Sequence, residues 1–264
     1  MLTIDWETFI DPAGRPLGEH SLGLSIGGFD GVHRGHQKLI GKVLDYAGSH
    51  GGLGGIITFR QNPRSVLHPQ SYPGDIYSLP QKLKTLEGLG AAFTVLIDFS
   101  GDFSKLSGKE FISLLGRRRI AYLAVGANFR CGYRLDTDAR GIQLLAGGAL
   151  TEVVPPLKEG GAPVSSSRIR QAIGAGNLRE ASLLLGRPYR MDLAGLRVRE
   201  VRGEWLWDLT GRAAPPGGRY AAAAYDANSN EGLRTDIVID SGQLILKQTS
   251  FFPTAVELLE TCSP

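Results

Sequence analysis

The ten residues Gly27-Gly-Phe-Asp-Gly-Val-His-Arg-Gly-His36 hold the densest set of groups suited to phosphate chemistry in this chain. They follow an apolar run that predicts a strand, Leu22–Ile26, and they run into a helical pattern from Gly35 to about Gly48. Free N–H groups at the start of a helix bind anions, and glycines let a phosphate approach the backbone. His33 and His36 are three residues apart, so both imidazoles can lie on one helix face and donate hydrogen bonds to phosphate oxygens.

A second polar segment is Val164-Ser-Ser-Ser-Arg-Ile-Arg170. Its three serines precede or open a predicted helix over Ser166–Gly174, and its two arginines fall in the first turns of that helix. Serine hydroxyls cap helix N-termini, and the Arg170 guanidinium can point back toward the same anion. Taken alone, the segment is also typical of an N-cap followed by arginines that face solvent, so both interpretations stay open.

Missing motifs exclude several other kinds of site. The chain has no G-x-x-x-x-G-K-S/T segment, so it is not a P-loop NTPase. No G-x-G-x-x-G segment follows a predicted strand, which argues against a nicotinamide-dependent dehydrogenase. No third ligand is evident beside His33 and His36, so a zinc hydrolase is not indicated. Two cysteines, Cys131 and Cys262, cannot form a disulfide framework, and we therefore predict a reducing, cytoplasmic location.

The composition is that of an ordinary folded protein, with 42% hydrophobic and 21% charged residues among 264. The 29 Lys and Arg residues exceed the 26 Asp and Glu residues only slightly, which suits an anionic small ligand but makes no basic stripe for a nucleic acid. No apolar run approaches the roughly 20 residues of a membrane span, and the first residues lack the pattern of a signal peptide. We predict no nucleic-acid, membrane or obligate protein partner.

Strand and helix patterns alternate through the first 187 residues, which predicts βαβ units and an α/β fold with a parallel sheet and helices on both faces. Such sheets bind ligands at the carboxyl ends of their strands, so we expect the site just after these ends. The predicted strands are 22–26, 55–59, 94–99, 121–125 and 151–154, and the predicted helices are 35–48, 81–89, 107–118, 138–146, 166–174 and 177–185.

The pattern changes after Gly186-Arg-Pro188, where strand-like segments are joined by Gly, Pro and Asn turns. These segments are 196–206, 218–225 and 235–248, and residues 254–259 read as one short helix. We therefore predict two domains: an α/β domain over 1–187 and a small β-rich domain over 188–264.

The histidine motif and the later serine and arginine motif together resemble those of the nucleotidylyltransferases, and in detail the FMN adenylyltransferase module of bacterial FAD synthetases. The similarity covers nearly all of residues 20–189 and implies a Rossmann-like domain. Further segments carry it in the family's order: Thr58–Pro63, Leu79–Gly90 with Lys82 at the family's lysine, Phe103 with Leu106–Phe111, Val125–Gly132, and Leu184–Tyr189.

The resemblance implies the reaction of FMN with ATP to give FAD and pyrophosphate, with Mg²⁺ as cofactor. The FMN phosphate would attack the α-phosphorus in line, with no protein nucleophile. Implied catalytic residues are His33, His36, Ser167 and Arg170; implied ATP-binding residues are Gly27, Gly28, Phe29, Asp30, Gly35 and Ser166; and implied flavin-binding residues are Phe59, Asn62, Pro63, Asn128 and Cys131. No residue is implied for Mg²⁺.

Two kinds of departure from the family's pattern stand out. Gln61 replaces a usual proline, and Cys131 replaces a usual phenylalanine; the smaller Cys131 leaves less aromatic surface for the flavin. The riboflavin kinase signature G-F-P-T-A-N is missing from 190–264; Phe252-Pro-Thr-Ala255 copies part of it, but Val256 replaces the asparagine. The second domain thus resembles a shortened, degenerate kinase barrel, and we predict no riboflavin kinase activity.

Two alternatives stay open beside FMN adenylylation. The histidine motif is shared across the superfamily, so another phosphorylated substrate can take the place of FMN. A non-catalytic flavin or nucleotide sensor is the other alternative. Turnover separates them, because a sensor binds FMN or ATP and releases no pyrophosphate.

Overall fold

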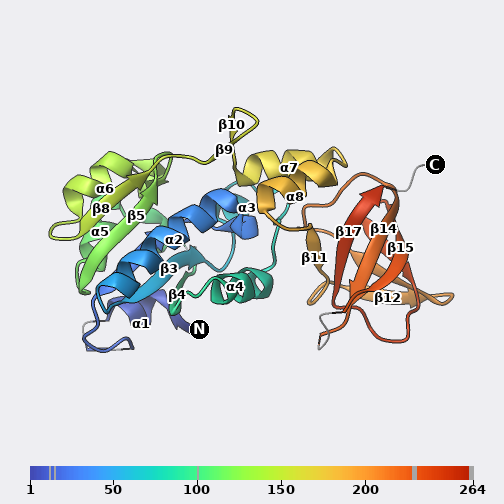
Figure 1. Cartoon of the computed structure of the whole chain (residues 1–264), viewed down its shortest axis with the longest axis horizontal. Helices are drawn as coiled ribbons and strands as arrows, with labels where there is room; N and C mark the ends of the chain where they lie inside the picture. Colours follow the sequence, from blue (N-terminus) through green and yellow to red (C-terminus); the bar gives the residue numbers. More distant parts are fainter. Residues whose placement is uncertain (12, 15, 100, 228–230, 262–264) are drawn as a thin grey trace. The chain divides into compact units, whose positions relative to one another are not determined.

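The computed structural model describes residues 1–264 except 12, 15, 100, 228–230 and 262–264, so Cys262 lies outside the described residues. Contacts divide the chain into two compact units, each built from two stretches of sequence (Figure 1). The first unit comprises Met1–Pro69 and Lys82–Pro163, and the second comprises Gln70–Gln81 and Val164–Pro264. The domain boundary expected after residue 187 stays a prediction.

The first unit contains a six-stranded parallel sheet in the order β1-β4-β3-β2-β5-β8, which confirms the predicted α/β class. The sequence pattern missed the edge strand β1 because it is four residues long and buries only Ile4. The strands are β1 (Leu2–Asp5), β2 (Leu22–Ile26), β3 (Leu53–Phe59), β4 (Phe93–Ile97), β5 (Ile120–Gly126) and β8 (Leu150–Val154).

Helices cover both faces of this sheet, as the alternation along β5 demonstrates. Leu123 and Val125 pack in one hydrophobic cluster with residues of α1, α5 and α6, whereas Tyr122 and Ala124 pack in another with residues of α2. Successive strand residues point to opposite faces, so these helices lie on opposite sides. The helices of this unit are α1 (Trp6–Ile10), α2 (Arg34–Ser49), α3 (Pro63–Leu67), α5 (Gly108–Leu115) and α6 (Ala139–Leu145), and α4 (Leu79–Gly88) begins in the second unit.

The first unit also contains the predicted helix start at Ser107 and several short strands and 3₁₀ turns. Helix α5 begins as predicted, since Ser107 accepts from the Glu110 N–H and Glu110 accepts from the Ser107 N–H, a capping box. The short strands are β6 (Arg130–Cys131), β7 (Thr137–Asp138), β9 (Lys158–Glu159) and β10 (Ala162–Pro163), and the 3₁₀ turns are η1 (Asp30–Val32), η3 (Phe103–Lys105) and η4 (Tyr133–Leu135), with η2 (Pro69–Ser71) at the junction of the units.

The second unit contains helices α7 (Ser166–Gly174) and α8 (Leu178–Leu185) and a curled antiparallel sheet in the order β11-β17-β14-β15-β16-β13-β12 (Figure 1). This confirms the predicted β-rich part. The strands are β11 (Arg190–Asp192), β12 (Val198–Val201), β13 (Glu204–Asp208), β14 (Gly218–Tyr225), β15 (Leu233–Asp240), β16 (Gln243–Lys247) and β17 (Ala255–Thr261).

The short helix predicted over 254–259 is wrong, because this segment belongs to strand β17. Val256 and Leu258 are buried in alternation, and β17 pairs with both β11 and β14. So short a run of apolar residues fits a helix or a strand equally well, and the two neighbouring strands decide. The single segments expected over 196–206 and 235–248 are each a hairpin, β12–β13 and β15–β16.

Candidate active site

The loop between β2 and α2 has a strained backbone. Phe29 and Val32 both have positive φ, +48° and +38°, with Gly31 at +74° between them. A β-branched residue in this region is rare and costs on the order of 1–3 kcal/mol. Phe29 and Val32 are both buried, so core packing of their side chains holds the strained loop at the carboxyl end of β2.

The structure brings the two imidazoles of the histidine motif together at the start of α2. His33 is the N-cap of this helix, and its Nδ1 accepts a hydrogen bond from the backbone N–H of His36 at 3.2 Å. The rings stack with centroids 3.5 Å apart and planes 14° apart, and the Phe29 ring lies against His36 at 5.0 Å. Because Nδ1 of His33 accepts, the proton of a neutral His33 is on Nε2.

Burial and two neighbouring basic side chains favour the neutral form of His36. Its pKa lies well below 6.5, first because burial penalises the charged imidazole and then because His33 and Lys82 repel a proton. The Nδ1 atom of His36 is buried and has no hydrogen-bond partner among the described residues. A buried unsatisfied polar atom is costly, so its presence here calls for a ligand or a functional explanation.

Lys82 joins the loop between β2 and α2 to the end of β3. This lysine of α4 is buried, and its Nζ donates to the carbonyl of Phe59 at 2.8 Å, to Oγ1 of Thr58 at 3.1 Å and to the carbonyl of Gly28 at 3.4 Å. Thr58 Oγ1 in turn donates to the same Gly28 carbonyl at 3.0 Å. The ends of β2 and β3 are therefore fixed to each other. Sequence reasoning identified Lys82 only as part of a motif and missed these contacts.

The residues predicted to contact a flavin lie at the ends of β3 and β5. The Phe59 ring meets Phe99 and Phe103 edge to face, at 5.9 and 6.3 Å. Asn62 caps α3 through the backbone N–H of Arg64 at 3.1 Å. The other residues predicted to bind flavin are Pro63 at the first position of α3, exposed Asn128 after β5, and half-buried Cys131 in β6.

Cys131 has no features of a reactive thiol. Burial, with a smaller effect of the Asp136 carboxylate, raises its pKa to about 11. The adjacent Gly132 has φ +83°, and a Cβ there would lie 2.2 Å from the backbone nitrogen of Gly108. Only glycine fits this position, which brings the β6 segment close to the start of α5.

In the second unit, Arg170 anchors the 70–81 segment. Arg170 is 8% exposed; its Nε donates to the Gly74 carbonyl at 2.7 Å, its Nη2 donates to the Tyr72 hydroxyl at 3.1 Å, and the guanidinium lies 5.3 Å from the Tyr72 ring centroid. These partners are almost a hundred residues away in sequence, and no local signal identifies them. Ser166 and Ser167 open α7, whose N-cap is Ser165.

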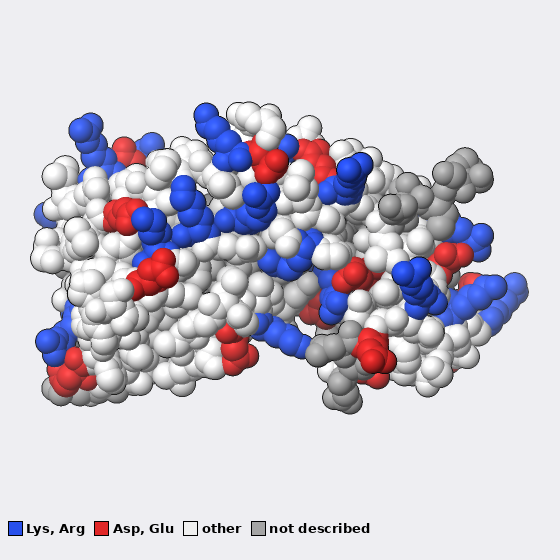
Figure 2. All heavy atoms as spheres, in the orientation of Figure 1, with Lys and Arg blue, Asp and Glu red and all other residues white. Residues whose placement is uncertain are grey.

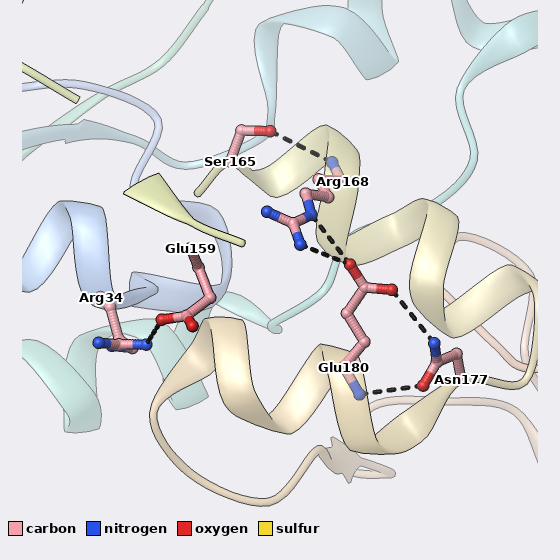
Figure 3. A network of polar contacts seen from close by, with 6 residues as sticks. All are labelled: Arg34, Glu159, Ser165, Arg168, Asn177 and Glu180. Atoms are coloured by element: carbon pink, nitrogen blue, oxygen red, sulfur yellow. Dashed lines mark hydrogen bonds and ion pairs between the residues drawn. The ribbon is translucent and has the colours of Figure 1, made fainter. Parts of the chain in front are cut away.

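Two ion pairs near the motifs were also missed by sequence reasoning (Figure 3). Arg34, the first residue of α2, pairs with Glu159 of β9 at 2.5 Å. In the second unit, Arg168 of α7 pairs with Glu180 of α8 at 2.8 Å, and Asn177 donates to the same carboxylate. Both pairs hold the arginines that lie beside the predicted site residues.

Charged side chains on the face drawn in Figure 2 are of both signs, with acidic groups close to basic ones. Among the described residues, no set of three or more His, Cys, Asp and Glu side chains is placed to hold a metal ion. Within the same part of the chain, no helix has the length and apolarity needed to cross a bilayer.

A parallel sheet with helices on both faces, and with a strained, histidine-bearing loop at the carboxyl end of β2, defines the first unit as a Rossmann-like α/β domain. The family model described as FAD synthetase matches residues 18–168, more than half of the chain, and the chain belongs to this family.

The bifunctional riboflavin kinase/FMN adenylyltransferase of Bacillus subtilis is 34% identical over 76% of this chain and 66% of its own length. The protein of the same description from Escherichia coli K12 is 32% identical over 64% of this chain and 55% of its own length. The chain thus matches between about half and two thirds of these relatives.

A solved structure described as a macrolide-efflux protein from Streptococcus pneumoniae has the same fold. The two chains superpose with a TM-score of 0.82 over 99% of this chain and 91% of that one, at 23% identity. This similarity concerns the fold alone.

Proposed function

We propose that this chain transfers AMP from ATP to FMN and releases pyrophosphate, forming FAD. The observation that carries the proposal is the direct link between the histidine loop and the Phe59 segment through Lys82 and Thr58. One segment offers an anion site and the other an aromatic edge, so their fixed proximity suits a reaction between a nucleotide and a flavin phosphate. The family match and the description of the curated relatives support the same assignment.

The chemistry requires orientation of two anions rather than an enzyme nucleophile. An oxygen of the FMN phosphate attacks the α-phosphorus of ATP in line, and the bond from that phosphorus to the pyrophosphate oxygen breaks. N–H groups at the start of α2 and the imidazoles of His33 and His36 stabilise the negative charge that develops. Phosphate oxygens favour a protonated imidazole, so ATP binding raises the pKa of His36 from its lowered resting value.

The remaining predicted contacts follow the same logic. We assign Gly27, Gly28, Phe29, Asp30 and Gly35 to the nucleotide, since they form the loop and helix start that bear the histidines. The proposed action of Ser166, Ser167 and Arg170 on the triphosphate rests on the sequence motif.

Magnesium enters this proposal as part of the MgATP substrate. Mg²⁺ in nucleotide sites is held largely by substrate phosphates and water, with one or two carboxylates. No step assigned to the residues above depends on a protein ligand to the metal.

The proposal is tested with the purified chain, ATP and Mg²⁺, supplied with either FMN or riboflavin, by resolving the flavins and measuring pyrophosphate. We expect FAD from FMN, and neither FMN nor FAD from riboflavin. Val256, where the kinase signature has asparagine, is buried within β17 and has no group for a metal or phosphate. FMN formed from riboflavin would contradict the monofunctional assignment, whereas flavin or ATP binding without pyrophosphate would indicate a sensor.

A substitution at Cys131 tests the flavin assignment separately. Cys131→Phe restores an aromatic ring beside the predicted flavin site, and we expect FMN binding to tighten by about 0.5–1.5 kcal/mol, or roughly 2- to 12-fold in Kd. Flavin fluorescence quenching measures this change, with Cys131→Ala as the matched control without a ring. If Cys131→Phe abolishes FMN binding, the pocket is shaped around the smaller side chain and the assigned contact is wrong.

A further inference from the structure

We propose that Lys82 is a positioning residue for adenylyl transfer: its ammonium group holds the loop that follows β2 and the loop that follows β3 at a fixed separation. The proposal rests on the proposed function, because it assigns the two loops to ATP and FMN. It gives a role in the reaction to a side chain that contacts the loops rather than the reacting atoms.

The contacts of Lys82 join two loops that come from different strands. Its Nζ donates to the carbonyl of Gly28, beyond the end of β2, and to the hydroxyl of Thr58 and the carbonyl of Phe59 at the end of β3. Each of these oxygens belongs to a residue in, or next to, the predicted ATP or flavin segment. A lysine ammonium can donate in three directions, which lets one side chain tie both strand ends.

Packing alone does not account for a lysine at this position. The position is 8% exposed, and the same helix fills the core with Leu86, which is fully buried. Removing an ammonium from water is costly unless hydrogen bonds compensate, whereas an apolar side chain of the same length has no such cost. The ammonium is therefore explained by the three oxygens that it binds.

Lys82 also acts on the charge of His36. The neighbouring charges that lower the pKa of His36, after burial, are His33 at the start of α2 and Lys82 on α4. The lysine charge thereby adds to the effect of burial, which is the main reason that the pKa of His36 is lowered. The negative charge of incoming phosphates favours the protonated imidazole and raises the pKa of His36, so the charge of His36 responds to nucleotide binding.

The test compares Lys82→Met with Lys82→Arg and with Lys84→Met, an exposed lysine of the same helix as control. For Lys82→Met we expect kcat to fall by about 100-fold, as for a small misplacement of reacting groups, with KM raised for both ATP and FMN. We expect faster amide exchange at residues 27–33 and 59–62. Lys84→Met should match the wild-type protein in all three measurements.

The charge effect has its own readout in the protein without substrate. NMR titration of His36 should give a higher pKa in Lys82→Met than in the wild type, while Lys82→Arg, which keeps the charge, retains a lowered pKa. Wild-type kcat and unchanged exchange in Lys82→Met would overturn the proposal. If Lys82→Met fails to fold, Thr58→Val takes its place as the test, because it removes only the bridging hydroxyl. Wild-type kcat and unchanged amide exchange in Thr58→Val would then overturn the proposal.

The amide exchange and the titration do not require turnover. If the wild-type chain makes no FAD while these two measurements change as expected, the proposed function fails and the link between the loops stands. If the wild type makes FAD and Lys82→Met does so equally well, the positioning role fails and the function stands.

Discussion

His36→Ala is expected to lower the rate of FAD formation by about 10²–10³ while the protein stays folded. The imidazole lies at the start of α2 with a buried Nδ1 that has no partner among the described residues, so its hydrogen-bonding capacity is available to substrate. Alanine removes that contact to the phosphates. Little core packing is lost, because the aromatic rings that the imidazole contacts are those of His33 and Phe29, both at the loop itself.

The measurement is kcat with saturating ATP and FMN, together with thermal unfolding. His20→Ala is the matched control, because His20 is an exposed histidine of the same unit. Native His36 resists protonation, so the wild type loses stability as the pH falls below about 6.5, where the unfolded chain gains a proton. His36→Ala should lose that part of the pH dependence. A near wild-type kcat in His36→Ala would remove the histidine pair from the mechanism.

Arg170→Ala is expected to lower FAD formation by a similar factor, about 10²-fold, and in addition to destabilise the protein by about 1–3 kcal/mol. The rate effect follows from the predicted contact with the leaving pyrophosphate. The stability effect follows from the structure, because the substitution leaves the Gly74 carbonyl and the Tyr72 hydroxyl without these donors. Arg170→Lys should restore neither fully, since lysine lacks the forked donor geometry.

Tyr72→Phe separates the two effects of Arg170. It removes the hydroxyl that accepts from Nη2 and keeps the ring under the guanidinium, so we expect a smaller loss of stability and an unchanged kcat. Denaturant unfolding and steady-state kinetics measure the two quantities. If Arg170→Ala unfolds more easily yet retains wild-type kcat, Arg170 is an anchor of the 70–81 segment and not a contact of the triphosphate.

Most of the first unit could be predicted from local patterns in the sequence. The alternation of apolar strands and amphipathic helices places β2, α2, β3 and β5 within a few residues of their bounds, because each of these elements has a strong periodicity of its own. Ser107 and Glu110 mark the start of α5 by a capping interaction that needs only four consecutive residues. The rule that ligands bind at carboxyl ends of parallel strands then selects the histidine loop.

The tertiary structure decided the features that depend on contacts between distant residues. Strand β1 and strand β17 are stabilised by pairing with partners far along the chain, and β17 contradicts a local pattern that also fits a helix. The same holds for charged side chains. Lys82 binds the carbonyl of Phe59 and Arg170 binds the carbonyl of Gly74, and the residues next to Lys82 and Arg170 in sequence identify neither partner. A buried charge is tolerated only where the fold brings oxygens to it, and that is a property of the folded chain.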